Sequence, residues 1–117
     1  MDSDDDLIPH HVVSRLVDSG QLERIKRDPE FARALLGEAG SLLLQGEPAT
    51  ARMILRNLVK ATVGFEGLAA ELAKSCKSLH RMLSPSGNPS MDNLAAIFDV
   101  LRRNLGVVIE VQAVESA

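Results

Sequence analysis

Residues 76–89 read CKSLHRMLSPSGNP, and this stretch decides how the second half of the chain is interpreted. Its first eight residues fit a helix of about two turns, and Ser75, directly before them, is a suitable N-cap. The serines, the glycine and the two prolines that follow cannot continue a helix. The sequence therefore predicts a short helix that is ended by a rigid loop.

On a helical projection of residues 75–84, in which successive residues lie about 100° apart, Leu79 and Leu83 point to the same side. These two leucines define the buried direction. Lys77 and Arg81 then point almost directly away from the core. The outward face, with its flanks, consists of Lys77, His80, Arg81 and Ser84.

Two interpretations fit this outward face. Arginine can donate two hydrogen bonds to a guanine edge, lysine can bind a guanine acceptor or a phosphate, and histidine or serine can donate to either. The helix would then be a recognition helix that enters a DNA groove, and the segment before it is close enough to form a helix-turn-helix. Alternatively, it is a solvated helix hairpin on the surface of a small bundle.

Asp2 to Asp6 are expected to form a disordered, solvated end, and most of the chain from Pro9 to Gly106 is predicted to be helical. Asp28 and Pro29 suit the N-cap and the first position of a long helix, and Pro48 begins the next helix directly after Gly46. Apolar residues recur at helical spacing in every segment. We therefore expect helices at about residues 9–19, 29–45, 48–62, 65–73, 75–84 and 91–105.

Two details of these helices bear on packing and function. In the last helix, the predicted buried stripe begins at Met91 and continues through Phe98 to Leu105. In the helix that begins at Pro48, three cations recur every four residues, at Arg52, Arg56 and Lys60. Such a row fits either a solvated face or an edge that faces DNA phosphates.

The C-terminal residues VVIEVQAV, 107–114, alternate in character with a period of two, which predicts a β-strand. A single strand cannot pair its own backbone groups. We therefore expect this strand to pair with the same strand of a second copy of the chain. The predicted domains are an acidic, partly helical arm at residues 1–27, a helical domain at 28–106 and a strand with its tail at 107–117.

Composition narrows the classes of protein. The chain has 117 residues, of which 45% are hydrophobic and only 3% aromatic, so base stacking on aromatic platforms is not expected. The single Cys76 excludes an intrachain disulfide and a cysteine-rich zinc site. The acidic first residues are not expected to be a secretory signal, and no apolar run of membrane-spanning length is found. We expect a soluble, cytoplasmic protein without a cofactor or a metal ion.

Charge is distributed unevenly along the chain, whose formal net charge is −3. Residues 1–46 contain five Lys and Arg against nine Asp and Glu, whereas residues 47–117 contain eight against seven. A nearly neutral second half can still present a local basic face. No paired carboxylates, phosphate-binding glycine loop or metal-ligand spacing is present, so no enzyme is predicted.

The segment SLHRMLSPSGNPSMDNL, residues 78–94, resembles the addiction-module antidote proteins, the HigA-type antitoxins with a lambda-repressor-like helix-turn-helix. The likeness extends from about Asp28 to Val111. It implies an all-α, homodimeric protein that binds double-stranded operator DNA and represses its own operon. It also implies that a small ribonuclease-type toxin is a possible partner, since many members neutralise one.

The resemblance places the helix-turn-helix at about residues 65–84 and the recognition helix at residues 75–84. Combined with the projection, it gives one set of candidate DNA-binding residues, in which Asn88 of the Gly-Asn-Pro loop contacts a phosphate or braces the turn. Cys76 is expected to be half-buried. The full set is Ser75, Cys76, Lys77, His80, Arg81, Ser84 and Asn88.

Three positions depart from the family pattern. Ala73 stands where a glycine is usual at the turn, Lys74 where an apolar residue follows, and Phe65 where a polar residue holds a phosphate. The hypothesis from sequence is therefore a transcriptional regulator of antitoxin type. The alternative is a protein-interaction module that mainly sequesters a toxin or another partner and binds DNA weakly or not at all.

Overall fold

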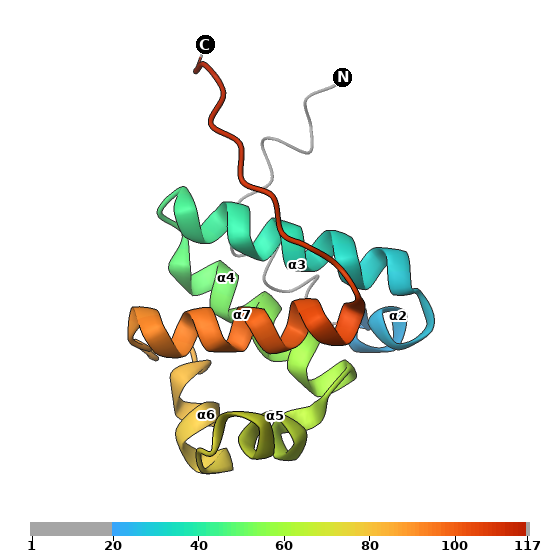
Figure 1. Ribbon diagram of the computed structural model, residues 1–117, viewed down its shortest axis with the longest axis vertical. Coiled ribbons are helices and arrows are strands. Elements are labelled where there is room, and N and C mark those ends of the chain that lie inside the picture. The colour runs from blue at the N-terminus through green and yellow to red at the C-terminus, as the bar shows by residue number, and fades with distance from the viewer. Residues whose placement is uncertain (1–19, 117) are drawn as a thin grey trace.

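The computed structural model describes residues 20–116, and all the regular secondary structure in that part of the chain is helical. The predicted helix at residues 9–19 and most of the acidic arm lie outside the described residues. The all-α class is confirmed. The helices are α2 (Gln21–Arg27), α3 (Pro29–Leu44), α4 (Pro48–Ala61), α5 (Gly64–Leu72), α6 (Cys76–Met82) and α7 (Met91–Leu105) (Figure 1).

Three of the helices, α3, α6 and α7, begin at capping residues of the sequence. Asp28 accepts a hydrogen bond from the backbone N–H of Phe31 at 3.2 Å, which caps α3. Ser90 accepts one from the backbone N–H of Asn93 at 3.1 Å and caps α7 in the same way. These side chains satisfy donors that the first turn of a helix leaves without a partner.

Helix α4 lies in the middle of the molecule, with α3 above it and the pair α5–α6 below it in the view of Figure 1. Leu55, Leu58 and Val59 of α4 are fully buried. Helix α7 crosses in front of α4 and contributes Ile97 and Leu101 to the same core. All these side chains are apolar, so the burial of aliphatic surface supplies the main stabilisation.

The predicted stripe of α7 was wrong at its first residue. Met91 is 84% exposed, because it lies at the first position of the helix, beyond the edge of the core. The fully or nearly fully buried residues are Ile97, Val100 and Leu101. The buried face of α7 is therefore displaced toward the C-terminal half of the helix.

Helix α2 packs on this same body. Ile25 is 3% exposed within the core, and the guanidinium of Arg24 lies 3.8 Å from the ring centroid of Phe31. A cation above an aromatic face is attracted by the ring electrons. The end of the N-terminal arm is thus joined to the helical domain by apolar burial and a cation–π contact.

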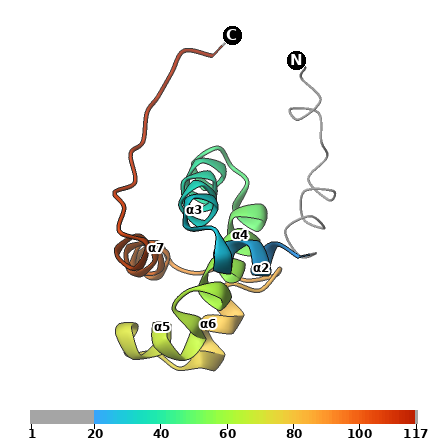
Figure 2. The same ribbon diagram turned by 90° about the vertical axis from the view of Figure 1, so that its right-hand side faces the viewer.

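Residues 107–116 are extended but form no β-ladder with any described residue. In both views this tail passes α3 and continues beyond the helical body, whereas α5 and α6 lie at the other end of the longest axis (Figure 2). The predicted pairing with a second copy is not addressed by a single chain. The tail and the α5–α6 pair are therefore two well separated surfaces.

Candidate nucleic-acid interface

Helix α6 is fixed to the body by its leucines. Leu79 is 0% exposed and Leu83, directly after the helix, is 1% exposed, as the helical projection predicted. Ser75 caps the N-terminus by accepting a hydrogen bond from the backbone N–H of Ser78 at 3.1 Å. A helix of seven residues is not stable alone in water, so these contacts hold it in place.

The turn between α5 and α6 consists of three residues, Ala73, Lys74 and Ser75. Ala73 has φ 55° and ψ 45°, and it is the one non-glycine residue with positive φ in the described part of the chain. The backbone N–H of Lys74 donates to the carbonyl of Ala69 at 3.1 Å, which closes the end of α5. Ala73 therefore adopts the left-handed conformation that glycine most often supplies at the end of a helix.

Lys77 and Arg81 are exposed on the outer side of α6. Neither forms an ion pair with another residue between 20 and 116, and the same holds for the exposed Lys74 in the turn. The acidic Glu71 of α5 is already paired with Arg103 of α7 at 3.6 Å. The α6 side of the molecule thus presents cations that the described residues do not neutralise.

The cations of α7 differ in this respect. Arg102 lies 2.8 Å from a carboxylate oxygen of Asp99, and Arg103 lies 3.0 Å from the other. The hydrogen bond from Arg103 holds the pKa of Asp99 below its usual value, and the neighbouring charge of Arg102 acts in the same direction. These arginines are engaged within the chain, whereas Lys77 and Arg81 remain available to a ligand.

His80 is exposed, and its ring lies on the ring of Phe65. The centroids are 3.8 Å apart and the planes differ by 16°, which is a stacked arrangement. Cys76 is half-buried, as expected, with its Sγ 3.6 Å from the carbonyl oxygen of Phe65. Sequence reasoning treated Phe65 only as a lost phosphate anchor. Its spacing from His80 along the chain gave no signal of the stacking.

The loop after α6 is held rigidly against that helix. The hydroxyl of Ser84 donates to the carbonyl of Arg81 at 2.8 Å, so this predicted site residue closes the helix end. The backbone N–H of Gly87 donates to the carbonyl of Ser84 at 3.0 Å. A Cβ atom at Gly87 would overlap the main-chain oxygens of Arg81 and Met82, so only glycine fits there.

Arg52 of α4 also fixes this loop. Its guanidinium donates to the carbonyl of Ser84 at 3.2 Å and to that of Pro85 at 3.0 Å. The row of cations on α4 therefore includes a residue with a structural role, while Lys60 is exposed. Asn88 is exposed farther along the same loop, downstream of this anchor.

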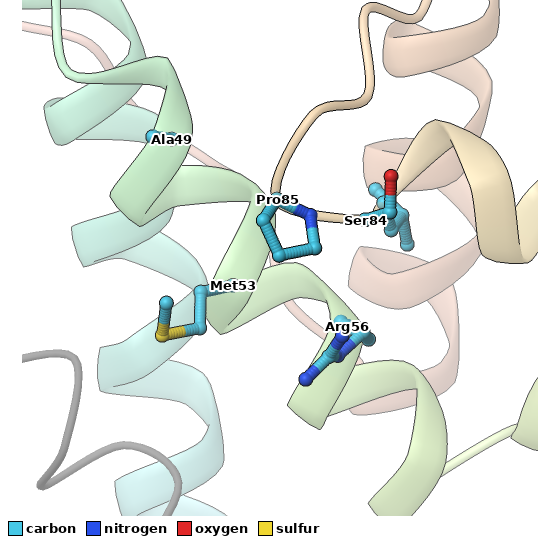
Figure 3. A pocket seen from close by; sticks show the side chains of 6 residues that line it. Ala49, Met53, Arg56, Ser84 and Pro85 are labelled. Carbon is cyan, nitrogen blue, oxygen red and sulfur yellow. The ribbon is translucent and has the colours of Figure 1, made fainter.

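A small cavity lies where α4 meets the loop (Figure 3). Its volume is about 20 Å³, which is enough for one water molecule and too small for an organic ligand. The buried Nε of Arg56, which also lines the cavity, has no hydrogen-bond partner among residues 20–116. The lining residues are Ala49, Met53, Arg56, Leu83, Ser84 and Pro85.

The structure therefore distributes the predicted site residues over three environments. Lys77, His80 and Arg81 lie together on the outer side of α6, with Ser75 at its N-terminus. Cys76 and Ser84 make internal contacts, and Asn88 lies in the adjoining loop.

Among residues 20–116, no three His, Cys, Asp or Glu side chains are grouped so that they could hold a metal ion. None of the helices α2–α7 has the length and apolar character that crossing a membrane requires. Comparison of the chain with protein-family models, curated proteins and solved structures finds no significant match.

Proposed function

We propose that the chain is a cytoplasmic DNA-binding transcriptional regulator of antitoxin type, without enzymatic activity, that binds its operator as a homodimer. Helices α5 and α6 form the helix-turn-helix, and α6 enters the major groove. The observation that carries the proposal is the exposed pair Lys77 and Arg81, which no residue between 20 and 116 neutralises, on a short helix that the core holds rigidly.

The arrangement around α6 supports this function physically. Leu79 and Leu83 fix the helix axis, so Lys77 and Arg81 project from a rigid frame and lose little freedom when they bind. Lysine and arginine contacts to phosphates release counterions, and arginine can also read a guanine edge. His80, supported by Phe65, presents a further hydrogen-bonding group beside them.

The three-residue turn supports the same proposal. Ala73 adopts the left-handed conformation for which glycine is usual, so this departure from the family pattern is compatible with a tight turn. The resemblance of residues 78–94 to HigA-type antitoxins adds autorepression and a small toxin partner to the proposal. Dimers with a two-fold axis would read half-sites one helical turn apart, or a multiple of it.

A second candidate function is a protein-interaction module that sequesters a toxin or another partner. The observation that favours it is the exposed apolar tail, in which Val108, Val111 and Val114 are each at least 72% exposed. In that case the main interface lies on the tail and the cations of α6 have no DNA partner. The two candidates differ in whether the chain binds its own upstream DNA.

The decisive experiment measures binding to that upstream DNA by fluorescence anisotropy at low and moderate salt. The double variant Lys77→Ala/Arg81→Ala should bind at least about 30-fold more weakly, since each contact contributes about 1–3 kcal/mol. Its salt dependence should also become shallower. Its melting temperature should stay within about 3 °C of wild type, because both side chains are exposed.

The matched control is Lys26→Ala/Arg27→Ala, which removes the same charge from exposed positions on α2. It should retain nearly full affinity. A Lys77/Arg81 variant that binds like wild type, or a control that loses as much affinity, contradicts the proposed face. Absence of binding at low salt, together with copurification of a small neighbouring protein, supports the interaction module instead.

A further inference from the structure

The C-terminal tail is attached to the helical body at its beginning only. Val107 donates its backbone N–H to the carbonyl of Arg102 at 2.9 Å, and Val107 and Ile109 are half-buried against the core. From residue 110 to residue 116 every residue is exposed. The apolar residues Val108, Val111 and Val114 are 80%, 72% and 75% exposed.

The backbone of the tail has no partner in the described chain. Residues 108–116 neither donate nor accept a backbone hydrogen bond with any residue between 20 and 116. An extended segment with free N–H and C=O groups and exposed valines is a template for pairing with another strand. Water can satisfy the polar groups, but it leaves the three valines exposed.

We infer that residues 108–114 pair with the same residues of a second copy as an antiparallel ribbon, with Val111 on the two-fold axis. This inference deepens the homodimer part of the proposed function. The three exposed valines are spaced symmetrically about Val111. In this register Val111 faces its own copy, and each Val108 faces Val114.

The neighbouring registers are less favourable. In an antiparallel pair, side chains directly opposite each other lie on the same face of the ribbon. The two-fold axis of a symmetric pair must therefore pass through a residue, and the nearest alternative registers place it at residue 110 or residue 112. An axis at Glu110 places two carboxylates opposite each other, which is destabilising. An axis at Gln112 places Val114 opposite Glu110 and Val108 opposite Ser116. Only the axis at Val111 gives every valine of the ribbon a valine neighbour.

The surface beside the tail is compatible with a second strand. A groove of about 310 Å³ lies between α3 and residues 109–113. Its other wall is formed by Gln45 and by the α3 residues Gly37, Gly40, Ser41 and Leu44. Leu44 in that wall is 65% exposed. The exposed Leu44 and Val111 therefore line the same groove, and a second copy would cover both.

Disulfide trapping tests the register. In a Cys76→Ala background, which removes the one native cysteine, Val111→Cys places two thiols opposite each other across the axis. Directly opposite positions have Cα atoms about 4.5–5.5 Å apart, which suits a disulfide. Under mild oxidation at low protein concentration, this variant should form covalent dimers at least about 50-fold faster than Val108→Cys.

A mixture of two single variants gives the sharper measurement. Val108→Cys alone places its two thiols about 20 Å apart along the ribbon, six residues at about 3.3 Å each, and Val114→Cys alone does the same. Neither should crosslink to itself. When the two variants are mixed and allowed to exchange subunits, the heterodimer should crosslink rapidly, and mass spectrometry should show a bond between residues 108 and 114.

Three results would overturn the inference. Val108→Cys that crosslinks to itself as fast as Val111→Cys contradicts the antiparallel register. Glu110→Cys that crosslinks faster than Val111→Cys moves the axis. If Val111→Cys crosslinks slowly and the wild-type chain sediments as a monomer, the tail pairs with a different partner. No DNA is used, so a failure here leaves the test of Lys77 and Arg81 unaffected, and the reverse also holds.

Discussion

Helix α6 and the C-terminal tail are both short exposed segments, yet they differ in how many of their polar backbone groups and apolar side chains find partners in the described chain. Helix α6 has a capped N-terminus, two buried leucines and a loop that Arg52 fixes at its other end. The tail has two half-buried side chains, at Val107 and Ile109, and beyond them a backbone that pairs with no residue between 20 and 116. The described residues therefore satisfy helix α6, but they do not satisfy the tail.

This difference indicates which surface is ready to bind a ligand and which surface needs assembly to become ordered. A surface that is already rigid gains affinity because little freedom is lost on binding, and α6 fits that description. A strand with free backbone groups gains order only when a second strand arrives. The candidate DNA surface is therefore preformed, and the proposed dimer surface is completed by assembly.

Hydrogen exchange tests this comparison, with the largest effect that we expect. The backbone amides of Leu79 and Leu83 lie in hydrogen bonds of 3.1 and 3.2 Å, so they should exchange at least about 1,000-fold more slowly than unstructured peptide. The amides of residues 110–116 should exchange at nearly the unstructured rate in dilute protein. They should become protected as the concentration rises, whereas Leu79 should not change.

The measurement uses mass spectrometry or NMR over a wide concentration range. The control is a variant truncated after Glu110. It keeps the anchors Val107 and Ile109 but cannot form the ribbon, because the rest of the ribbon is removed. Protection of residues 110–116 at concentrations at which the chain sediments as a monomer would mean that the tail is satisfied within one chain. The contrast between the two regions would then be wrong.

The sequence predicted the parts of the molecule that depend on neighbouring residues. The caps Asp28, Ser75 and Ser90 lie where the helix starts were expected, because capping is local. The burial of Leu79 and Leu83 followed from a spacing of four residues. These two features are sufficient to place the exposed face of α6.

Contacts between distant parts of the chain were not predictable in this way. The stacking of His80 on Phe65 and the hydrogen bonds from Arg52 to the loop depend on how helices cross, which periodicity does not encode. The exposure of Met91 has the same origin, since the core ends before the start of α7. The candidate site was thus located from sequence, but its supporting contacts were not.

The second prediction concerns the rigidity of α6 and its loop. Arg52→Ala removes the donors to the carbonyls of Ser84 and Pro85, one of them in a partly buried position. The free energy of unfolding should fall by about 1–2 kcal/mol, and the melting temperature by about 5–10 °C. The amide of Gly87, which donates to Ser84, should exchange faster.

Lys60→Ala is the matched control, because it removes an exposed cation from the same helix. Its melting temperature should stay within about 3 °C of wild type. If Arg52→Ala leaves both the melting temperature and the exchange of Gly87 unchanged, the loop is rigid for another reason. The distinction between a fixed α6 region and an open tail would then depend on the leucines alone.

The smallest expected effect concerns the turn before α6. Ala73 holds a left-handed conformation that costs a residue with a Cβ atom about 1–2 kcal/mol, so Ala73→Gly should raise the free energy of unfolding by about 1 kcal/mol. Ala70→Gly, at an exposed position inside α5, should lower it by a similar amount. Urea unfolding measures both changes in the free energy of unfolding, provided that the dependence of this free energy on urea concentration is the same for each variant. The same substitution is made at two positions three residues apart, so changes of opposite sign in the free energy of unfolding isolate the effect of the backbone conformation of the turn. Changes of equal sign would show that Ala73 is not left-handed in solution.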